Sequence, residues 1–392
     1  MKFLHERGGM LLWFLSVSVV LTLALLKPQS HSVLPAYEYG TAMFLSGGPL
    51  YDIDSAMGYL YTPAFAALYT PFYMLGSEFG GLLWRLIGVC CLTAAVLRQA
   101  NLFDRSNASA IVSLTFAIAI PMALGAIRNG QSTVLLTAAC WFLTLDAFKN
   151  NRSSTVIWTY VALIAKPTAI VMVLLVAALR PRMIPFLALA IIFVFATPYA
   201  FEHYSYVNDQ HVAFFRLLTA MGTGSSGTFE AADFTAPFAA LSASLPVDMA
   251  MGVRVVAAGL VLVFSLWFDR RNERHIGAFA VFLLAVFYMT VFNPRVESNT
   301  YVMLAVPAAF AISIIRDANP GWSLSTALGT AVFLVGLTGI DRGVHEALDP
   351  WFKPLIMTLV TTVLLHSLSW RSRHRLCSQT GQVGRVPVDR SA

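Results

Sequence analysis

Long apolar runs separated by short polar segments dominate the sequence. Several runs reach the roughly 18–20 residues that cross a bilayer as a helix. The pattern predicts an all-α polytopic membrane protein with about 12 transmembrane helices, in a range of about 10 to 13. The predicted spans lie near residues 10–27, 79–98, 107–126, 131–148, 154–166, 168–180, 183–202, 250–268, 276–293, 300–315, 322–340 and 353–371.

The N-terminal segment combines features of a signal peptide and of a membrane helix. Lys2 and Arg7 precede an apolar run over residues 10–26, as in a secretory signal. The run is long for such a signal, and no small-residue cleavage site follows it. The pattern favours a retained first helix, with a signal peptide as the alternative.

Two segments interrupt the simple alternation of spans and loops. Residues 61–75 are apolar, but they contain Pro63 and Pro71 and are short for a span. Counting them as a span inverts the charge bias of every later loop, so they are predicted to form an interfacial helix, with a short true span as the alternative. The runs on either side of Lys166-Pro167 are also short, and predict either two half-length helices or one broken helix.

These assignments leave two large outer segments, 28–78 and 203–249. The second contains the glycine–serine run 222–227, which lacks the Lys-Ser/Thr of a phosphate loop and is typical of a mobile loop near a site. Residues 1–371 are predicted to form a single integral-membrane domain that includes both outer segments. Residues 372–392 are predicted to form a disordered, basic cytoplasmic tail.

Composition and charge agree with a membrane protein. The chain is 57% hydrophobic and 12% charged, against about 25% charged residues in typical soluble domains. The net charge of +6 is spread over short loops and the tail, which favours contact with membrane lipids and argues against nucleic acid. With a cytoplasmic N-terminus, most of the 26 Lys and Arg fall in the inner loops 1–9, 98–106, 149–153, 180–182, 269–275, 316–321 and the tail. The four cysteines have no metal or disulfide spacing.

A few polar residues lie at the outer edges of apolar runs, in 128–131, at Lys166-Pro167 and in 293–299. An ionisable group at membrane depth costs about 2.5–3.5 kcal/mol, so a functional role is its default interpretation. The alternative is a loop-end charge that reaches water. Outer cations suit a lipid-linked phosphate, whose charge they also stabilise when it leaves. A first-loop carboxylate could accept the proton of an acceptor hydroxyl.

The candidate site residues follow from this chemistry. The catalytic candidates are Glu38, Asp52 and Asp54. The donor-phosphate and substrate-binding candidates are Lys166, Arg128, Asn129, Gln131, Arg295, Glu297, Asn299 and Tyr61. Each also has a structural alternative, such as a helix cap, a turn, or an Arg295–Glu297 pair. Arg254 receives no assignment. No cofactor is expected; Asp52-Ile53-Asp54 is only a weak metal signal, and metal dependence stays open.

Four features resemble glycosyltransferase family 87 of the GT-C superfamily, which includes polyprenol-phosphate-mannose-dependent mannosyltransferases. They are residues 42–66 with Gly47-Gly48-Pro49-Leu50-Tyr51-Asp52 and Tyr59-Leu60-Tyr61-Thr62-Pro63, then Asn129-Gly130-Gln131, then Lys166-Pro167-Thr168, and the charged loop 295–299, where the family has another polar loop near the site. The resemblance implies a GT-C-like fold for residues 1–371. The resemblance covers roughly residues 10–315. It implies an inverting hexosyltransferase in a bacterial cytoplasmic membrane, with an outer-face site, a polyprenyl-phosphate sugar donor and a lipid or glycan acceptor. Mannose is the sugar it suggests first.

The sequence departs from this family at one position. The family's expected base is an Asp early in the first outer loop, and counting back from Gly47-Gly48 places Val33 there. Glu38, Asp52 or Asp54 is expected to replace it, unless the base is lost. Two rival hypotheses therefore stand beside the enzyme: a transporter or flippase for a lipid-linked anion, and a catalytically silent relative that binds a lipid-linked sugar.

Overall fold

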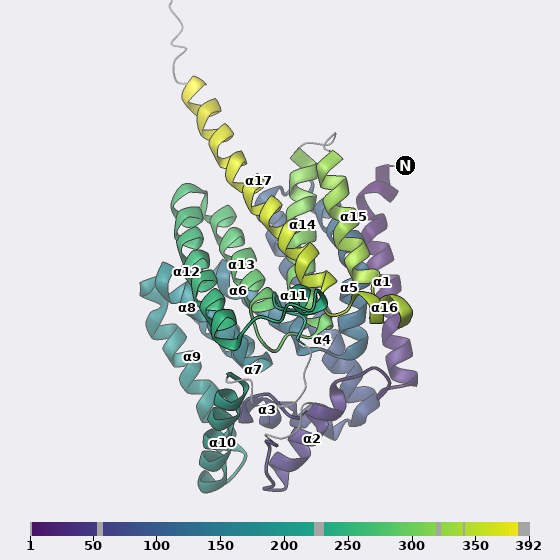
Figure 1. Ribbon diagram of the computed structural model, residues 1–392, viewed down its shortest axis with the longest axis vertical. Helices are drawn as coiled ribbons and strands as arrows, with labels where there is room; N and C mark the ends of the chain where they lie inside the picture. Colours follow the sequence, from purple (N-terminus) through teal and green to yellow (C-terminus); the bar gives the residue numbers. More distant parts are fainter. Residues whose placement is uncertain (1, 53–57, 223–230, 319–322, 340–341, 383–392) are drawn as a thin grey trace, which may run out of the picture.

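The computed structural model describes residues 2–52, 58–222, 231–318, 323–339 and 342–382, and all regular elements in these ranges are helical (Figure 1). The α-helices are α1 (Lys2–Leu26), α2 (Leu34–Leu45), α3 (Pro63–Met74), α4 (Gly76–Phe103), α5 (Ala108–Asn129), α6 (Ser132–Phe148), α7 (Arg152–Ala165), α8 (Ile170–Leu179), α9 (Ile184–Ala196), α10 (Tyr204–Gly222), α11 (Ala236–Ala240), α12 (Val247–Arg271), α13 (Arg274–Val291), α14 (Val302–Ala318), α15 (Ser323–Leu337), α16 (Arg342–Leu348) and α17 (Phe352–Gln382). Short 3₁₀ helices are η1 (Pro167–Ala169), η2 (Pro181–Met183), η3 (Thr197–Ala200) and η4 (Ser298–Tyr301).

Every predicted span coincides with a helix, which confirms the all-helical fold. Within the described residues, 8 helical segments are long and apolar enough to cross a membrane. Residues 132–148, 167–179 and 323–337 form shorter apolar helices. The total of about 12 transmembrane helices therefore stays a prediction, because length and composition alone do not decide whether a short helix crosses.

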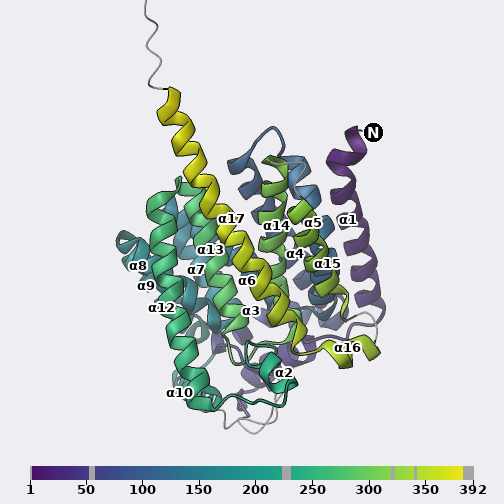
Figure 2. The same ribbon diagram turned by 45° about the horizontal axis from the view of Figure 1, so that its top comes forward.

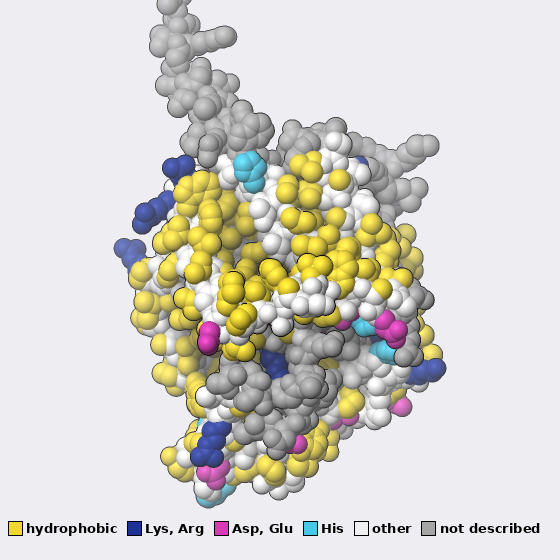
Figure 3. All heavy atoms as spheres, viewed as in Figure 1, with side chains coloured by type: hydrophobic (Ala, Val, Ile, Leu, Met, Phe, Trp, Pro, Cys, Tyr) yellow, Lys and Arg dark blue, Asp and Glu magenta, His cyan; other side chains and the backbone are white. Residues whose placement is uncertain are grey.

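The core lies where α5, α6 and α14 pack against their neighbours. α5 contacts α1, α4, α14 and α15, and the side chains of α14 are almost entirely buried. α1 is held by Trp13, which stacks on Phe116 of α5 and donates from Nε1 to Thr93 of α4. The peripheral helix α12 instead exposes large apolar side chains, including Leu260 and Val263. Figure 3 shows a broad hydrophobic middle on this face, as expected for lipid contact, with Lys and Arg at its upper left edge and in the lower half of the molecule.

α7 and α8 form an antiparallel hairpin whose tip is Lys166. Lys166 is extended (φ −164°, ψ 134°), because Pro167 disfavours a helical conformation in the residue before it. The first residue of α7 and the last residues of α8 both lie near the end of α6. α7 starts just after α6, and the Arg180 guanidinium, directly after α8, lies 3.9 Å from the centroid of the Phe148 ring. Arms of 14 and 10 residues reach about 20 Å or less, well short of a bilayer core of about 30 Å. The tip is therefore recessed.

Ion pairs fix the base of this hairpin. Arg98 of α4 pairs with Asp146 of α6, which also accepts a hydrogen bond from Ser154 of α7. Arg180 pairs with Asp269 of α12 at 2.6 Å. The start of α1 and the far end of α17 lie at this end of the bundle, whereas α2, α10 and α16 lie at the opposite end (Figures 1 and 2).

The structure adds detail to three expectations. The predicted interfacial helix is present as α3: residues 63–67 are buried against α2 and α4, whereas Tyr73, Met74 and Leu75 are exposed. The expected outer loop 203–249 is partly helical, forming α10 and α11. Its glycine–serine run lies outside the described residues from 223 onward. α17 continues to Gln382, past the predicted tail boundary at 371, and residues 383–392 are not described.

Candidate active site

The turn between α5 and α6 is fixed by contacts from two other segments. Gly130 ends α5 in a left-handed conformation (φ +75°), where an alanine Cβ would lie 3.0 Å from the Leu34 side chain. Arg85 of α4 donates to the carbonyls of Ile127 (3.0 Å) and Arg128 (2.9 Å). The Val33 N–H donates to the Asn129 carbonyl at 2.8 Å. The position expected to hold an Asp therefore lies beside this turn.

Four of the predicted residues form a polar cluster: Tyr61, Gln131, Lys166 and Glu297. Gln131 Nε2 donates to Glu297 Oε2 at 2.7 Å. The negative charge of Glu297 acts on the Lys166 ammonium at the hairpin tip and on the Tyr61 hydroxyl. Glu297 is thus the carboxylate at the centre of the cluster, and it comes from a segment more than 100 residues away from the other three members.

Aromatic side chains of the first outer segment support Tyr61. Its hydroxyl lies 3.1 Å from that of Tyr37, which accepts the Ser132 N–H at 3.0 Å. Tyr51 donates to the Tyr61 carbonyl at 2.8 Å, and the Tyr61 ring stacks on Phe65. Burial raises the pKa of Tyr61 to about 12, and the charge of Glu297 acts in the same direction. The hydroxyl therefore stays protonated at neutral pH.

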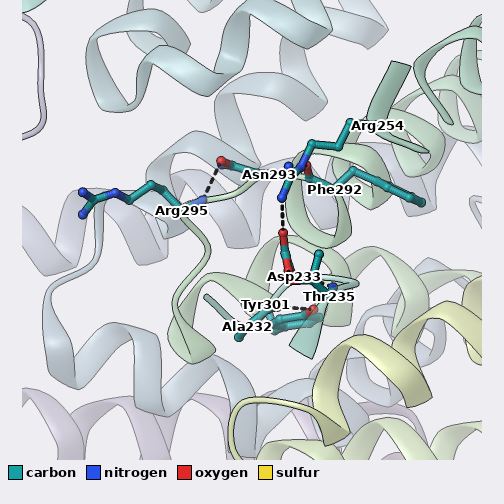
Figure 4. A network of polar contacts seen from close by, with 8 residues as sticks. All are labelled: Ala232, Asp233, Thr235, Arg254, Phe292, Asn293, Arg295 and Tyr301. Atoms are coloured by element: carbon teal, nitrogen blue, oxygen red, sulfur yellow. Dashed lines mark hydrogen bonds and ion pairs between the residues drawn. The ribbon is translucent and has the colours of Figure 1, made fainter. Parts of the chain in front are cut away.

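The segment before Glu297 is anchored by a buried ion pair (Figure 4). Asp233 accepts from Arg254 Nη2 of α12 at 2.7 Å, and the Asp233 side chain is fully buried. Arg254 Nε also donates to the Phe292 carbonyl at 3.0 Å. Next to Asp233, the Ala232 N–H donates to the Val296 carbonyl at 2.8 Å. These bonds hold residues 292–296 against α12.

The segment after Glu297 is anchored by residues near the start of α17. Ser298 donates to the Asp349 carboxylate, and Lys353 Nζ donates to the Ser298 carbonyl at 3.4 Å. The Tyr301 hydroxyl donates to the Ala232 carbonyl at 2.8 Å. Glu297 is therefore held from both sides in sequence, which fixes its side chain toward Gln131.

Two predicted asparagines lie beside the cluster. Asn129 ends α5 directly before the turn, and its Oδ1 is buried with no hydrogen-bond partner among the described residues. Asn299 Oδ1 lies 3.5 Å from the point that a Cβ on Gly125 would occupy, one turn before Asn129 on α5. Both amides thus line the same side of α5 as the turn.

The other predicted residues have different surroundings. Glu38 is half-buried on α2, and its charge acts on Tyr69 of α3. Asp52 is exposed after α2, and Asp54 lies outside the described residues. Arg128 is also exposed. The Arg295 side chain points away from the Asp233–Arg254 pair in Figure 4, and burial lowers the pKa of its guanidinium.

Sequence reasoning missed three contributors. Arg85 is an arginine inside an apolar run, a signal that the cost of intramembrane charge makes informative. Arg254 carries the same signal, but its partner Asp233 lies in an outer segment whose path the sequence does not reveal. Tyr37 has no sequence signal of its own, because aromatic residues are common throughout this segment.

Helix starts converge on the cluster and add positive potential. α6 begins directly after Gln131, α8 begins after η1 behind Lys166, and α14 begins after η4 behind Glu297. The N-terminus of a helix carries roughly half a positive charge and unpaired N–H groups, which favour anions. Together with the Lys166 ammonium, these helix starts supply positive potential that favours an anion.

The comparisons with known proteins place this geometry in a wider setting. The sequence model of glycosyltransferase family 87 matches residues 59–294. The match includes Tyr61, Gln131 and Lys166, and ends just before Glu297. No curated protein matches the chain.

Proposed function

The chain belongs to glycosyltransferase family 87, and on that premise we propose that this membrane glycosyltransferase moves one hexose from a polyprenyl-phosphate donor to a lipid or glycan acceptor. Mannose is the first sugar to test. The substrate phosphate enters the recess around Lys166, and the apolar helices beside it face the isoprenoid chain.

The observation that carries this proposal is the position of Lys166. A lysine at the tip of a short hairpin, within reach of one carboxylate and beside helix starts, is costly to bury without an anionic ligand. A lipid-linked phosphate supplies that anion. Its charge increases as the bond to the sugar breaks, so the same cation stabilises the transition state more than the bound donor.

The transfer is a single displacement with inversion. The acceptor hydroxyl oxygen attacks the anomeric carbon, and the bond from that carbon to the phosphate oxygen breaks. The electron pair of the broken bond stays on the polyprenyl phosphate, beside Lys166. The hydroxyl proton passes to a carboxylate, for which Glu38, Asp52 and Asp54 were the candidates from sequence.

The site is proposed to face the exterior of a bacterial cytoplasmic membrane, with both termini inside. Basic residues gather near the C-terminal end of α6, at Arg98, Lys149, Arg152, Arg180 and Arg270, whereas Gln131 of the cluster lies at its N-terminal end. Cytoplasmic loops are enriched in Lys and Arg, which supports this orientation.

The test is sugar transfer by the purified full chain in nanodiscs. A panel of radiolabelled polyprenyl-phosphate sugars is incubated with extracted membrane lipids as acceptors. Lys166→Met is expected to lower turnover by roughly 10²–10³-fold, the loss typical of removing one group that stabilises developing charge. Lys149→Met is the matched control, because Lys149 is exposed at the opposite end of the bundle.

The outcomes separate the hypotheses. Transfer that depends on Lys166 but not on Lys149 supports the enzyme and identifies the sugar. Donor binding without transfer to any acceptor contradicts the proposal and favours a silent relative. Full activity of Lys166→Met would remove the residue on which the proposal rests.

A further inference from the structure

Glu297 differs from the other candidate carboxylates in its surroundings. Gln131 donates to Oε2 of Glu297 at 2.7 Å, and its charge acts on Lys166 and Tyr61. The charge of Glu38 acts instead on Tyr69, and Asp52 is exposed. Glu297 is thus the candidate that the structure joins directly to the proposed phosphate site.

The backbone around Glu297 is fixed, as a group that must meet a reacting atom requires. Val296 is held by Ala232 and Ser298 by Asp349, so both neighbours of Glu297 are anchored. Gln131 in turn follows the turn that Arg85 holds in place. The Glu297 side chain is therefore positioned by contacts on both sides of the site.

We propose that Glu297 accepts the proton of the acceptor hydroxyl, as the catalytic base of this enzyme. This inference rests on the proposed function and names a residue that sequence reasoning assigned only to substrate binding. The acceptor oxygen forms a bond to the anomeric carbon while its proton moves to a Glu297 oxygen. The sugar–phosphate bond breaks, its electron pair goes to the phosphate, and Lys166 stabilises the anion.

Binding the donor also prepares the base. The negative charge of Glu297 acts on the Lys166 ammonium. When the donor phosphate occupies Lys166, the cation is shared between two anions, and its hold on Glu297 weakens. The carboxylate then becomes a better proton acceptor while donor and acceptor are both bound, which couples donor binding to activation of the hydroxyl.

The experiment compares Glu297→Gln with Glu38→Gln and Asp52→Asn in the nanodisc assay, together with direct binding of the donor that the wild type uses. Glutamine keeps the shape and the contact to Gln131 but does not accept a proton. Glu297→Gln is expected to lower kcat by roughly 10²–10⁴-fold with donor Kd within a few-fold of wild type. The matched control is Glu273→Gln, because this carboxylate lies directly before α13 and is 60% exposed; it should keep turnover near the wild-type value.

The donor-binding measurement also shows that each variant folds, and it separates a base from a residue that only positions Lys166. A positioning residue would weaken donor binding as much as turnover, and this result would overturn the inference. Turnover retained by Glu297→Gln, or lost in Glu38→Gln or Asp52→Asn instead, would overturn it and leave the proposed function standing. Absence of transfer by the wild type would overturn both.

A pH–rate profile adds a readout that a structural role would not change. Glu297→Asp keeps a carboxylate but withdraws it by one methylene. It is expected to retain measurable turnover and the acidic limb of the wild-type profile, whereas that limb disappears from the residual rate of Glu297→Gln. An acidic limb that persists unchanged in Glu297→Gln would show that another group accepts the proton.

Discussion

Replacing Arg254 by Met tests how the segment before Glu297 is held. The Asp233 side chain is fully buried and Arg254 retains 15% exposure, with 2.7 Å between Nη2 and the carboxylate. Methionine matches the length of the arginine stem but removes the bonds to Asp233 and to the Phe292 carbonyl. Among the described residues, Asp233 keeps its bonds from the backbone N–H and the hydroxyl of Thr235, at 2.9 Å and 2.6 Å.

The expected loss in the free energy of unfolding follows from the difference in burial between Asp233 and Arg254. Removing one partner of a buried ion pair costs about 3–5 kcal/mol, because the remaining charge stays desolvated. Arg254→Met should reach that range. Asp233→Asn should cost less, because Arg254 keeps the Phe292 carbonyl and partial access to solvent. The double variant should be less destabilised than the sum of the single variants, with a coupling of about 1–3 kcal/mol.

The assay is the free energy of unfolding of all three variants in the same detergent, measured by denaturant titration, with donor binding followed in parallel. Arg254→Met should also weaken the contact between Glu297 and Gln131, because the backbone that carries Glu297 is released. Equal effects of the two single variants, or strictly additive effects in the double variant, would refute the reasoning that the buried Asp233 charge dominates.

Two further predictions concern the first outer segment. Gly40→Ala would place its Cβ 2.3 Å from the Tyr59 ring, so the free energy of unfolding should fall by about 1–3 kcal/mol. The matched control is Gly252→Ala on α12, where nothing lies within 4 Å of the added Cβ. This control should be neutral or stabilising. Burial raises the pKa of Tyr61 and of Tyr206 to about 12, against about 10 in an unfolded chain. The folded state therefore holds protons that the unfolded state loses, so stability should be intact below pH 10 and decline toward pH 12. Tyr61→Phe should flatten that decline in melting curves, and an unchanged slope would contradict the assignment.

The main elements of the fold were predictable because their signal is local. Apolar runs long enough to span a bilayer satisfy their backbone groups as helices, whatever surrounds them. The break at Lys166-Pro167 was also readable, because proline acts on the residue before it. Whether its two halves form one broken helix or a hairpin was not readable, since that depends on which partners Arg180 and Asp146 find.

Residues 61–75 show what a local pattern leaves open. Their prolines, length and aromatic content predict a helix at the membrane surface, and the helix is present as α3. Burial of residues 63–67 depends on separate segments, because α2 and α4 pack there and Gly40 lets the Tyr59 ring approach. A hydrophobic pattern shows which residues avoid water, but it does not show whether lipid or protein contacts them.

The candidate site, like the fold, was only partly predictable from the sequence. The sequence alone identified Lys166, Gln131 and Glu297 as polar residues at costly positions, since the energetic penalty of a charge beside an apolar run can be read without a structure. It could not rank the carboxylates, because Glu297 meets Gln131 across more than 160 residues of sequence. Only the tertiary structure, through the Asp233–Arg254 pair and the Ser298 contacts, brings that carboxylate to Gln131. The local sequence identifies which polar side chains are costly and therefore informative, whereas tertiary packing decides how far apart they lie.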